Sequence, residues 1–83
     1  MKEVVVYGTP MCPYCKMAKD YLAKRNVQFR DVDVSADREA AKAMIELSGQ
    51  MGVPQIVIGN SVIVGYDPDE LEKALAQGDK DDH

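Results

Sequence analysis

The chain has 83 residues, of which 46% are hydrophobic and 29% are charged, and its formal net charge is −4. This length holds one domain with one modest core, and the composition is that of an ordinary soluble globular protein. The acidic balance, without a basic cluster or interleaved aromatic residues, argues against binding to nucleic acid or to an anionic membrane. No apolar run approaches the roughly 20 residues that cross a bilayer.

The beginning of the chain predicts a cytoplasmic location. Met1 leads almost directly into an apolar run, without the regions of a signal peptide. The cytosol is reducing, and a persistent structural disulfide is unusual there. We therefore expect a cytoplasmic protein whose cysteines react and do not form a permanent structural disulfide. We also expect it to be a monomer.

The first predicted elements are a buried strand and a helix. Residues 2–7 are rich in β-branched and aromatic side chains, and residues 8–11 interrupt the run. Pro13 suits the first position of a helix, which places Cys12 at the helix N-terminus. The helix is expected to reach about Arg25, because apolar residues recur at helical spacing: Tyr14, Met17, Ala18, Tyr21 and Leu22.

A second strand and helix follow. Residues 28–34 alternate polar and apolar side chains, which predicts a half-exposed strand. Ser35 or Asp37 is expected to cap the next helix, which ends at Gly49. The side chains expected to face the core from this helix are Ala40, Ala43, Met44 and Leu47.

The last third of the sequence predicts a hairpin and a final helix. Residues 54–58 form a third strand, and residues 62–64 return beside it after a turn. Asp67 is expected to cap the last helix, with Pro68 at its first position. Its core-facing residues are predicted to be Leu71, Ala74 and Leu75.

The element order β-α-β-α-β-β-α predicts an α/β fold. The first two strands are joined through a helix, so they are expected to be parallel with a right-handed crossover. The last two strands pair as an antiparallel hairpin, which gives a four-stranded mixed sheet with helices on both faces. We expect one domain at residues 1–77 and a disordered polar tail at residues 78–83.

Cys12 and Cys15, the only cysteines of the chain, stand three positions apart in Cys-Pro-Tyr-Cys. Unpaired N–H groups and the positive end of the helix dipole favour a thiolate at Cys12, which predicts that Cys12 is the nucleophile. Cys15 lies about one turn further on the same face, roughly 5–6 Å away. We expect it to be more buried and to resolve mixed disulfides.

Other interpretations of this pair remain open at this point. A structural disulfide closes too small a loop to stabilise much. A zinc site needs two more ligands, and the only histidine is His83 at the chain end. A subunit-bridging metal or iron–sulfur centre and an inert pair of core cysteines are further alternatives. The sequence predicts no metal site and no tightly bound cofactor within one chain.

Three segments resemble the active-site segments of glutaredoxins. They are Cys12-Pro13-Tyr14-Cys15, Val53-Pro54-Gln55-Ile56 about forty residues later, and Gly65-Tyr66-Asp67 before the last helix. The resemblance runs from about residue 3 to residue 77. It implies the thioredoxin fold, with strand order 2-1-3-4, and a cis peptide bond between Val53 and Pro54.

The resemblance also implies a site for glutathione as a co-substrate. Tyr14 would flank the tripeptide, and the Val53 backbone beside Pro54 would pair with its cysteinyl part. Asp67, with Gly65 and Tyr66 before it, would receive the γ-glutamyl end. Asp67 as a helix cap alone is an equally economical interpretation.

The sequence departs from the glutaredoxin pattern at positions that usually carry a cation. Thr9 and Pro10 stand where a lysine usually precedes the first cysteine, and Met51 stands where a basic residue usually precedes the Val-Pro turn. Val64 replaces the first glycine of a Gly-Gly pair. A charge-assisted hydrogen bond is worth roughly 1.5–3 kcal/mol, so the missing cations weaken glutathione binding by about tenfold or more.

These features predict a dithiol–disulfide oxidoreductase that reduces protein disulfides or glutathione-mixed disulfides through Cys12 and Cys15. As an alternative, the departures point toward glutaredoxin-like proteins of the NrdH-redoxin type, which take electrons from thioredoxin reductase and pass them to ribonucleotide reductase, although Pro-Tyr between the cysteines is the common glutaredoxin pair. Two alternatives are a non-enzymatic carrier of a metal or iron–sulfur cluster and a redox-inert binding module.

Overall fold

The computed structural model describes residues 3–81 and orders them in the predicted sequence of elements. Strand β1 (Val4–Gly8) leads into helix α1 (Pro13–Lys24), and strand β2 (Arg30–Asp33) leads into helix α2 (Arg38–Ser48). Strands β3 (Gln55–Ile58) and β4 (Ser61–Val64) precede helix α3 (Pro68–Asp81). In the described part of the chain, no helix has the length and apolar character that crossing a bilayer requires.

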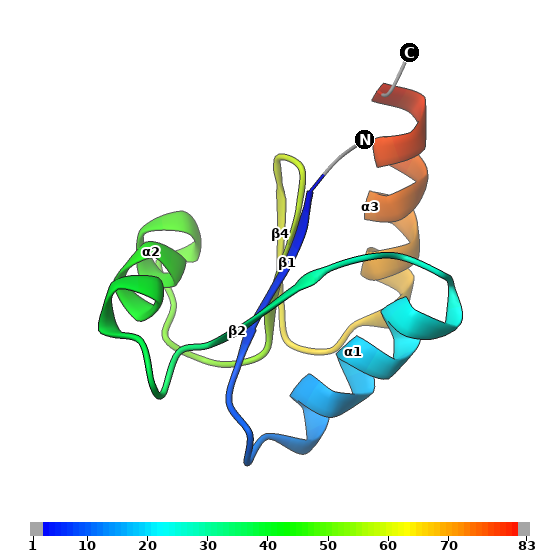
Figure 1. Ribbon diagram of the computed structural model, residues 1–83. Helices are drawn as coiled ribbons and strands as arrows, with labels where there is room; N and C mark the ends of the chain where they lie inside the picture. The colour runs from blue at the N-terminus through cyan, green and yellow to red at the C-terminus, as the bar shows by residue number, and fades with distance from the viewer. Residues whose placement is uncertain (1–2, 82–83) are drawn as a thin grey trace.

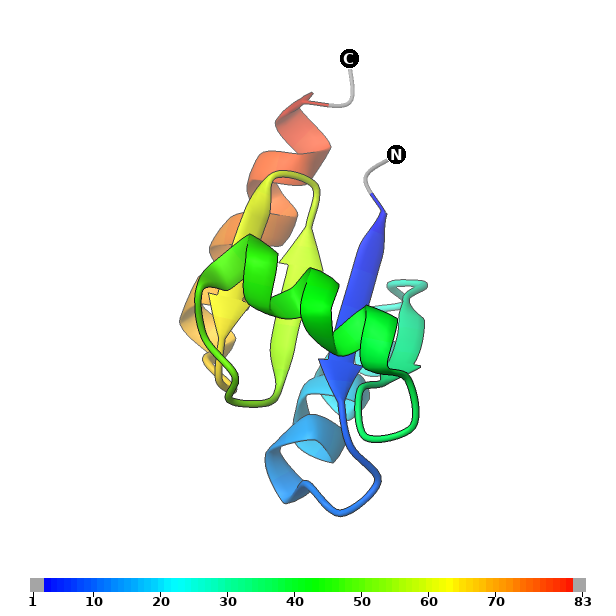
Figure 2. The same ribbon diagram turned by 90° about the vertical axis from the view of Figure 1, so that its left-hand side faces the viewer.

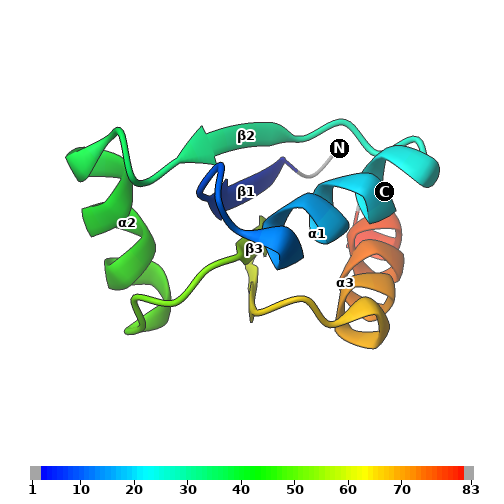
Figure 3. The same ribbon diagram turned by 90° about the horizontal axis from the view of Figure 1, so that it is seen from below.

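The four strands form one sheet in the order β2-β1-β3-β4, which confirms the predicted topology. Strand β1 pairs with β2 in parallel and with β3 antiparallel, and β3 pairs with β4 antiparallel. Figure 1 shows the sheet nearly edge-on, with α2 on one side and α1 and α3 on the other. The view from below shows the same three layers (Figure 3).

The main core lies between the sheet and the pair α1 and α3. Alternate residues of β1 and β3 point into it, because successive side chains of a strand face opposite ways. Leu22 and Leu71 meet these strands from the two helices, and both side chains are fully buried. The buried cluster consists of Val4, Val6, Ala18, Leu22, Ile56, Ile58, Ile63, Leu71 and Ala74.

Helix α2 covers the other face of the sheet alone, crossing the strands in Figure 2. Asp37 caps it through a 3.1 Å hydrogen bond from the Ala40 N–H, and Gly49 ends it, as predicted. The prediction that Ala43 and Leu47 face the core is wrong, because both are exposed. The helix is rotated so that Met44 is buried with Ile45 half-buried beside it, since a single helix on a flat face needs only a narrow stripe.

The apolar residues of α1 are not equally buried: Tyr14 is 60% exposed and Met17 is 45% exposed. The buried stripe of α1 consists of Cys15, Ala18 and Leu22. Helix α3 continues to Asp81, past the domain boundary expected at residue 77. The remainder of the predicted tail, residues 82–83, lies outside the described residues.

Candidate active site

Cys12 is the N-cap residue of α1, with φ −93° and ψ 111°, outside the helical region. Its Sγ accepts a hydrogen bond from the Cys15 N–H at 3.2 Å, where a serine or aspartate oxygen usually accepts in a helix cap. The first-turn N–H groups and the helix dipole therefore both stabilise negative charge on this sulfur. Cys12 is half-buried, so solvent and substrate reach it.

Cys15 lies beneath Cys12 and is 1% exposed. The two sulfurs belong to separate free cysteines, so the structure represents the dithiol state. Burial raises the pKa of the Cys15 thiol to about 11, and the hydrogen bond to Cys12 adds to this effect. A backbone hydrogen bond from Thr9 and the charge of Lys19 act in the opposite direction. At neutral pH Cys15 is therefore a protonated thiol.

This raised pKa gives a testable dependence of stability on pH. In the unfolded chain Cys15 ionises near 9.0, whereas the folded state keeps the proton to about 11. The reduced protein therefore loses stability as the pH rises from about 9 to about 11, by about 1–3 kcal/mol. Urea unfolding under reducing conditions across this range measures the loss. Cys15→Ala provides the control for the other groups that titrate there, and an equal decline in both proteins would contradict the assignment.

The Val53–Pro54 segment lies beside the cysteines. The peptide bond between these residues is cis, as the resemblance implied. The Val53 carbonyl oxygen lies 4.0 Å from Cys12 Sγ, so the loop before β3 meets the start of α1 across 41 positions of sequence. Pro54 is buried, and its carbonyl accepts a 2.8 Å hydrogen bond from the Gly65 N–H.

Gly65, which donates this hydrogen bond, begins the third predicted segment. Gly65 has φ +90°, a backbone conformation in which a side chain is strained. Tyr66 packs against the main core, and Asp67 caps α3, because its Oδ1 accepts the Glu70 N–H at 3.2 Å. The structure thus gives Asp67 the capping role, while Tyr14 stands exposed on the first turn of α1.

Two residues near the site were not predicted from the sequence. Gly8 lies so close to Cys15 that an added Cβ would be 2.7 Å from Cys15 Sγ. Gln55 is 1% exposed, and its Nε2 donates to the carbonyls of Gln50 and Gly52 at 2.9 and 2.8 Å. These two bonds hold the loop that carries Val53. A glutamine inside an apolar strand was the available signal for Gln55.

Among the described residues, no group of three or more histidine, cysteine, aspartate or glutamate side chains is arranged to hold a metal ion. Of the two cysteine sulfurs, one lies at a helix N-terminus and is half-buried, and the other lies one turn deeper and is protonated. This arrangement on a β2-β1-β3-β4 sheet defines the class of thioredoxin-fold proteins with a dithiol site.

Comparison with known proteins narrows that class. The family model described as glutaredoxin matches residues 4–63, and the chain belongs to the glutaredoxin family. It is 42% identical over 72 residues to an uncharacterised glutaredoxin-like 8.6 kDa protein from the rubredoxin operon of Clostridium pasteurianum, covering 87% of this chain and 96% of that protein. Members of this family are thiol–disulfide oxidoreductases.

Two solved structures resemble the fold closely. The glutaredoxin of Archaeoglobus fulgidus superposes with a TM-score of 0.83 at 26% identity, covering 90% of this chain and 87% of that one. The glutaredoxin-like NrdH-redoxin of Escherichia coli superposes with a TM-score of 0.78 at 24% identity, covering 86% and 92%. Both likenesses support the thioredoxin fold.

Proposed function

We propose that this protein is a dithiol–disulfide oxidoreductase that reduces protein disulfides or glutathione-mixed disulfides through Cys12 and Cys15. The observation that supports it most is the 3.2 Å hydrogen bond from the Cys15 N–H to Cys12 Sγ, with Cys15 buried beneath. One backbone group thereby stabilises charge on the attacking sulfur and holds the second cysteine within reach. The proposal sets this reaction in the cytoplasm, where thiols are kept reduced.

The proposed reaction has two exchange steps. The Cys12 thiolate attacks one sulfur of a substrate disulfide, forming a mixed disulfide and releasing the other sulfur as a thiolate. Cys15 then loses its proton and attacks Cys12 Sγ. The Cys12–Cys15 bond forms, the bond from Cys12 to the substrate breaks, and the substrate leaves as a second thiolate. The substrate gains the two electrons that the cysteine pair loses.

The proposed substrate site surrounds Cys12. The Val53 carbonyl, 4.0 Å from Cys12 Sγ, is suited to pair with the backbone of a substrate cysteine. If glutathione is the ligand, we expect Tyr14 to flank it and the α3 N-terminus at Asp67 to receive its γ-glutamyl end. Pro54, Gly65 and Tyr66 form the floor between these contacts in this proposal.

Exposed apolar side chains next to two of the site segments in the sequence favour a second candidate for the electron donor. Met11 is 90% exposed and Met51 is 77% exposed, and each stands close in sequence to a site segment. Thr9, Pro10 and Met51 carry no charge for the carboxylates of glutathione. A protein donor, thioredoxin reductase, accommodates these features better than a small anionic tripeptide. This candidate keeps the same two-step chemistry and changes only the source of electrons.

Turnover with two electron sources separates these candidates. A disulfide substrate is supplied with this protein and either glutathione plus glutathione reductase or thioredoxin reductase, each with its nicotinamide cofactor. We expect thioredoxin reductase to support turnover at least about tenfold faster, since about tenfold is the binding lost with one charged contact. Introducing a cation by Met51→Lys should raise the rate with glutathione. Faster turnover of the unaltered protein with glutathione would contradict the thioredoxin reductase candidate.

A further inference from the structure

Gln55, the first residue of β3, carries a buried amide on the α2 side of the sheet. Its neighbour Ile56 belongs to the main core between the sheet and the pair α1 and α3, and successive side chains of a strand face opposite ways. Beside Gln55 in the sheet stand Tyr7 on β1 and Val64 on β4. The residue is 1% exposed. A polar group at such a depth requires hydrogen-bond partners.

Gln55 uses both of its amide hydrogens on the loop between α2 and β3. Its Nε2 donates to the Gln50 carbonyl at 2.9 Å and to the Gly52 carbonyl at 2.8 Å. These two acceptors fix the orientation of the amide, because the amide oxygen in that place would be repelled by both carbonyls. Within the described residues, Oε1 has no hydrogen-bond partner. A buried acceptor without a partner lowers stability, so the contribution of Gln55 lies in its two donations.

The bond to Gly52 determines the direction of the Val53 N–H. The Gly52 carbonyl and the Val53 N–H belong to one planar peptide unit. That unit is trans, since the cis bond of the segment is the following one, Val53–Pro54. In a trans unit the carbonyl and the N–H point in opposite directions. The bond that draws the Gly52 carbonyl toward the buried amide therefore turns the Val53 N–H away from that amide.

The backbone groups of Val53 are available to a ligand. Among residues 3–81, the Val53 N–H donates to no backbone carbonyl. The Val53 carbonyl oxygen lies 4.0 Å from Cys12 Sγ, which is a long contact with a weak donor. In an antiparallel ladder, a hydrogen-bonded pair of residues exchanges both N–H···O bonds. A substrate cysteine that lies antiparallel to Val53 can therefore make two hydrogen bonds while its sulfur meets Cys12.

Ser48 at the end of α2 holds the same loop from the other side. Its Oγ accepts the Gln50 N–H at 3.0 Å and lies 3.2 Å from the Gln50 carbonyl oxygen. Gln50 is thereby fixed between Ser48 and Gln55. The loop that leads to Val53 is restrained by side chains of both elements that it joins.

We propose that Gln55 is a positioning residue that sets the Gly52–Val53 peptide unit for pairing with the backbone of a substrate cysteine, so that the site selects disulfides flanked by peptide groups. The inference rests on the proposed function. In the exchange step the Cys12 thiolate forms a bond to the substrate sulfur, and the second substrate sulfur leaves with the electron pair of the broken bond. Gln55 takes no part in this exchange and acts only through Val53.

Two probes with one leaving group separate recognition of the backbone from the reactivity of Cys12. The first is a blocked tripeptide, acetyl-Ala-Cys-Ala-amide, joined through its sulfur to thionitrobenzoate. The second is mercaptoethanol joined to the same group. Cys12 attacks the aliphatic sulfur of either probe, because the aromatic thiol has the lower pKa and leaves faster, and its release is seen as colour. Stopped-flow mixing with the reduced protein gives a rate constant for each probe.

Gln55→Met keeps a similar length and removes both donations. We expect it to lower the rate constant for the peptide probe about three- to tenfold, the value of one or two weakened hydrogen bonds, and that for the mercaptoethanol probe by less than about twofold. Ser48→Ala loosens the loop without altering the buried amide, so it tests the inference even if Gln55→Met does not fold. It should give the same selective loss, about two- to threefold. Equal slowing of both probes, or an unchanged rate with the peptide probe in both variants, would overturn the inference.

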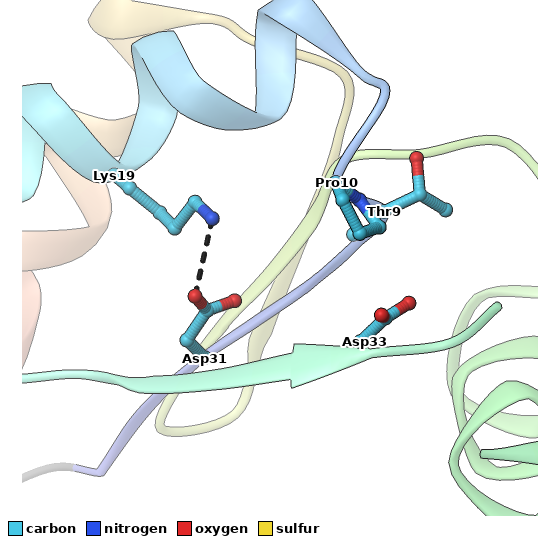
Figure 4. Close-up of a pocket in the computed structure, with 6 residues that line it drawn as sticks. Thr9, Pro10, Lys19, Asp31 and Asp33 are labelled. Carbon is cyan, nitrogen blue, oxygen red and sulfur yellow. Dashed lines mark hydrogen bonds and ion pairs between the residues drawn. The ribbon is translucent and has the colours of Figure 1, made fainter. Parts of the chain in front are cut away.

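Two controls separate this role from a general loosening of the fold. Gln28→Met makes the same chemical change at an exposed glutamine before β2. Asp31→Ala breaks a tertiary ion pair, in which Lys19 Nζ lies 3.1 Å from Asp31 Oδ2. Figure 4 shows Lys19 extending from α1 toward Asp31 on β2. The pocket beside this pair contains no residue of the Val53 loop and is lined by Gly8, Thr9, Pro10, Lys19, Asp31 and Asp33.

Both controls should leave the two rate constants within about twofold of those of the unaltered protein. A selective loss with Asp31→Ala as large as that with Gln55→Met would overturn the inference and leave the proposed function intact. If the unaltered protein released no coloured thiol from either probe, the proposed function itself would be overturned.

Discussion

Cys12→Ser should abolish disulfide reduction entirely, whereas Cys15→Ser should retain activity toward glutathione-mixed disulfides. The serine hydroxyl at position 12 can still accept the Cys15 N–H, so the helix cap and the fold are preserved. It is not a nucleophile toward sulfur, which leaves the first exchange step without an attacking group. Without Cys15 the first step proceeds, and a second thiol from solution must complete the reaction.

Steady-state reduction of a protein disulfide and of a glutathione-mixed disulfide measures this contrast. We expect at least a thousandfold loss for Cys12→Ser with both substrates, because the side chain that forms the covalent intermediate is missing. For Cys15→Ser we expect a loss of the same order only with the protein disulfide. Substantial activity of Cys12→Ser with either substrate would show that Cys15 can initiate exchange.

Gly8→Ala should destabilise the protein through a single new methyl group. The added Cβ would lie 2.7 Å from Cys15 Sγ and 3.1 Å from Cys15 Cβ, so Cys15 must shift. Overpacking of this kind typically costs about 1–3 kcal/mol. Replacing a glycine within a strand stabilises the folded state by about 0.5–1 kcal/mol. The steric clash is larger, so we expect the free energy of unfolding to fall.

Urea unfolding of the reduced protein measures this effect, and the chain offers a matched control. At Gly52, which also lies beside the site, an added Cβ meets nothing within 4 Å. Gly52→Ala should therefore leave the stability within about 0.5 kcal/mol of the unaltered protein. The double variant Gly8→Ala/Cys15→Ala should recover part of the loss, because the sulfur is gone. Equal stability of Gly8→Ala and Gly52→Ala would refute the close contact.

The fold could be predicted from the sequence because each element carries a local signal. Residues 4–6 are β-branched, Asp37 and Asp67 stand where helix caps are needed, and Gly49 ends α2. These signals depend only on residues that are close in the sequence, so they can be recognised without knowledge of the tertiary structure. The strand order came from the family resemblance and was confirmed.

The errors arise where burial depends on what lies across the sheet. Periodicity gave α2 an apolar stripe through Ala43 and Leu47, but the layer beneath it buries Met44 and leaves Leu47 53% exposed. Hydrophobic spacing predicts that a helix has an apolar face, but it does not determine how the helix is rotated about its axis against the sheet.

In the candidate site, too, some residues could be predicted from the local sequence and others depend on tertiary packing. Cys12 and Cys15 were identified from spacing and helix position, because the helix N-terminus is a local feature. Gly8 could not be assigned from the sequence, because its close approach to Cys15 depends on how α1 packs over β1.

The central claim is that Cys12 alone opens the reaction. A short exposure of the reduced protein to a limiting amount of glutathione disulfide, quenched with acid and followed by peptide mass spectrometry, locates the first sulfur to be modified. Cys15→Ser, which cannot proceed to the second step, should carry one glutathione, attached at Cys12. Rapid attachment of glutathione to Cys15 in the Cys12→Ser variant, at a rate like that of Cys12, would contradict the account.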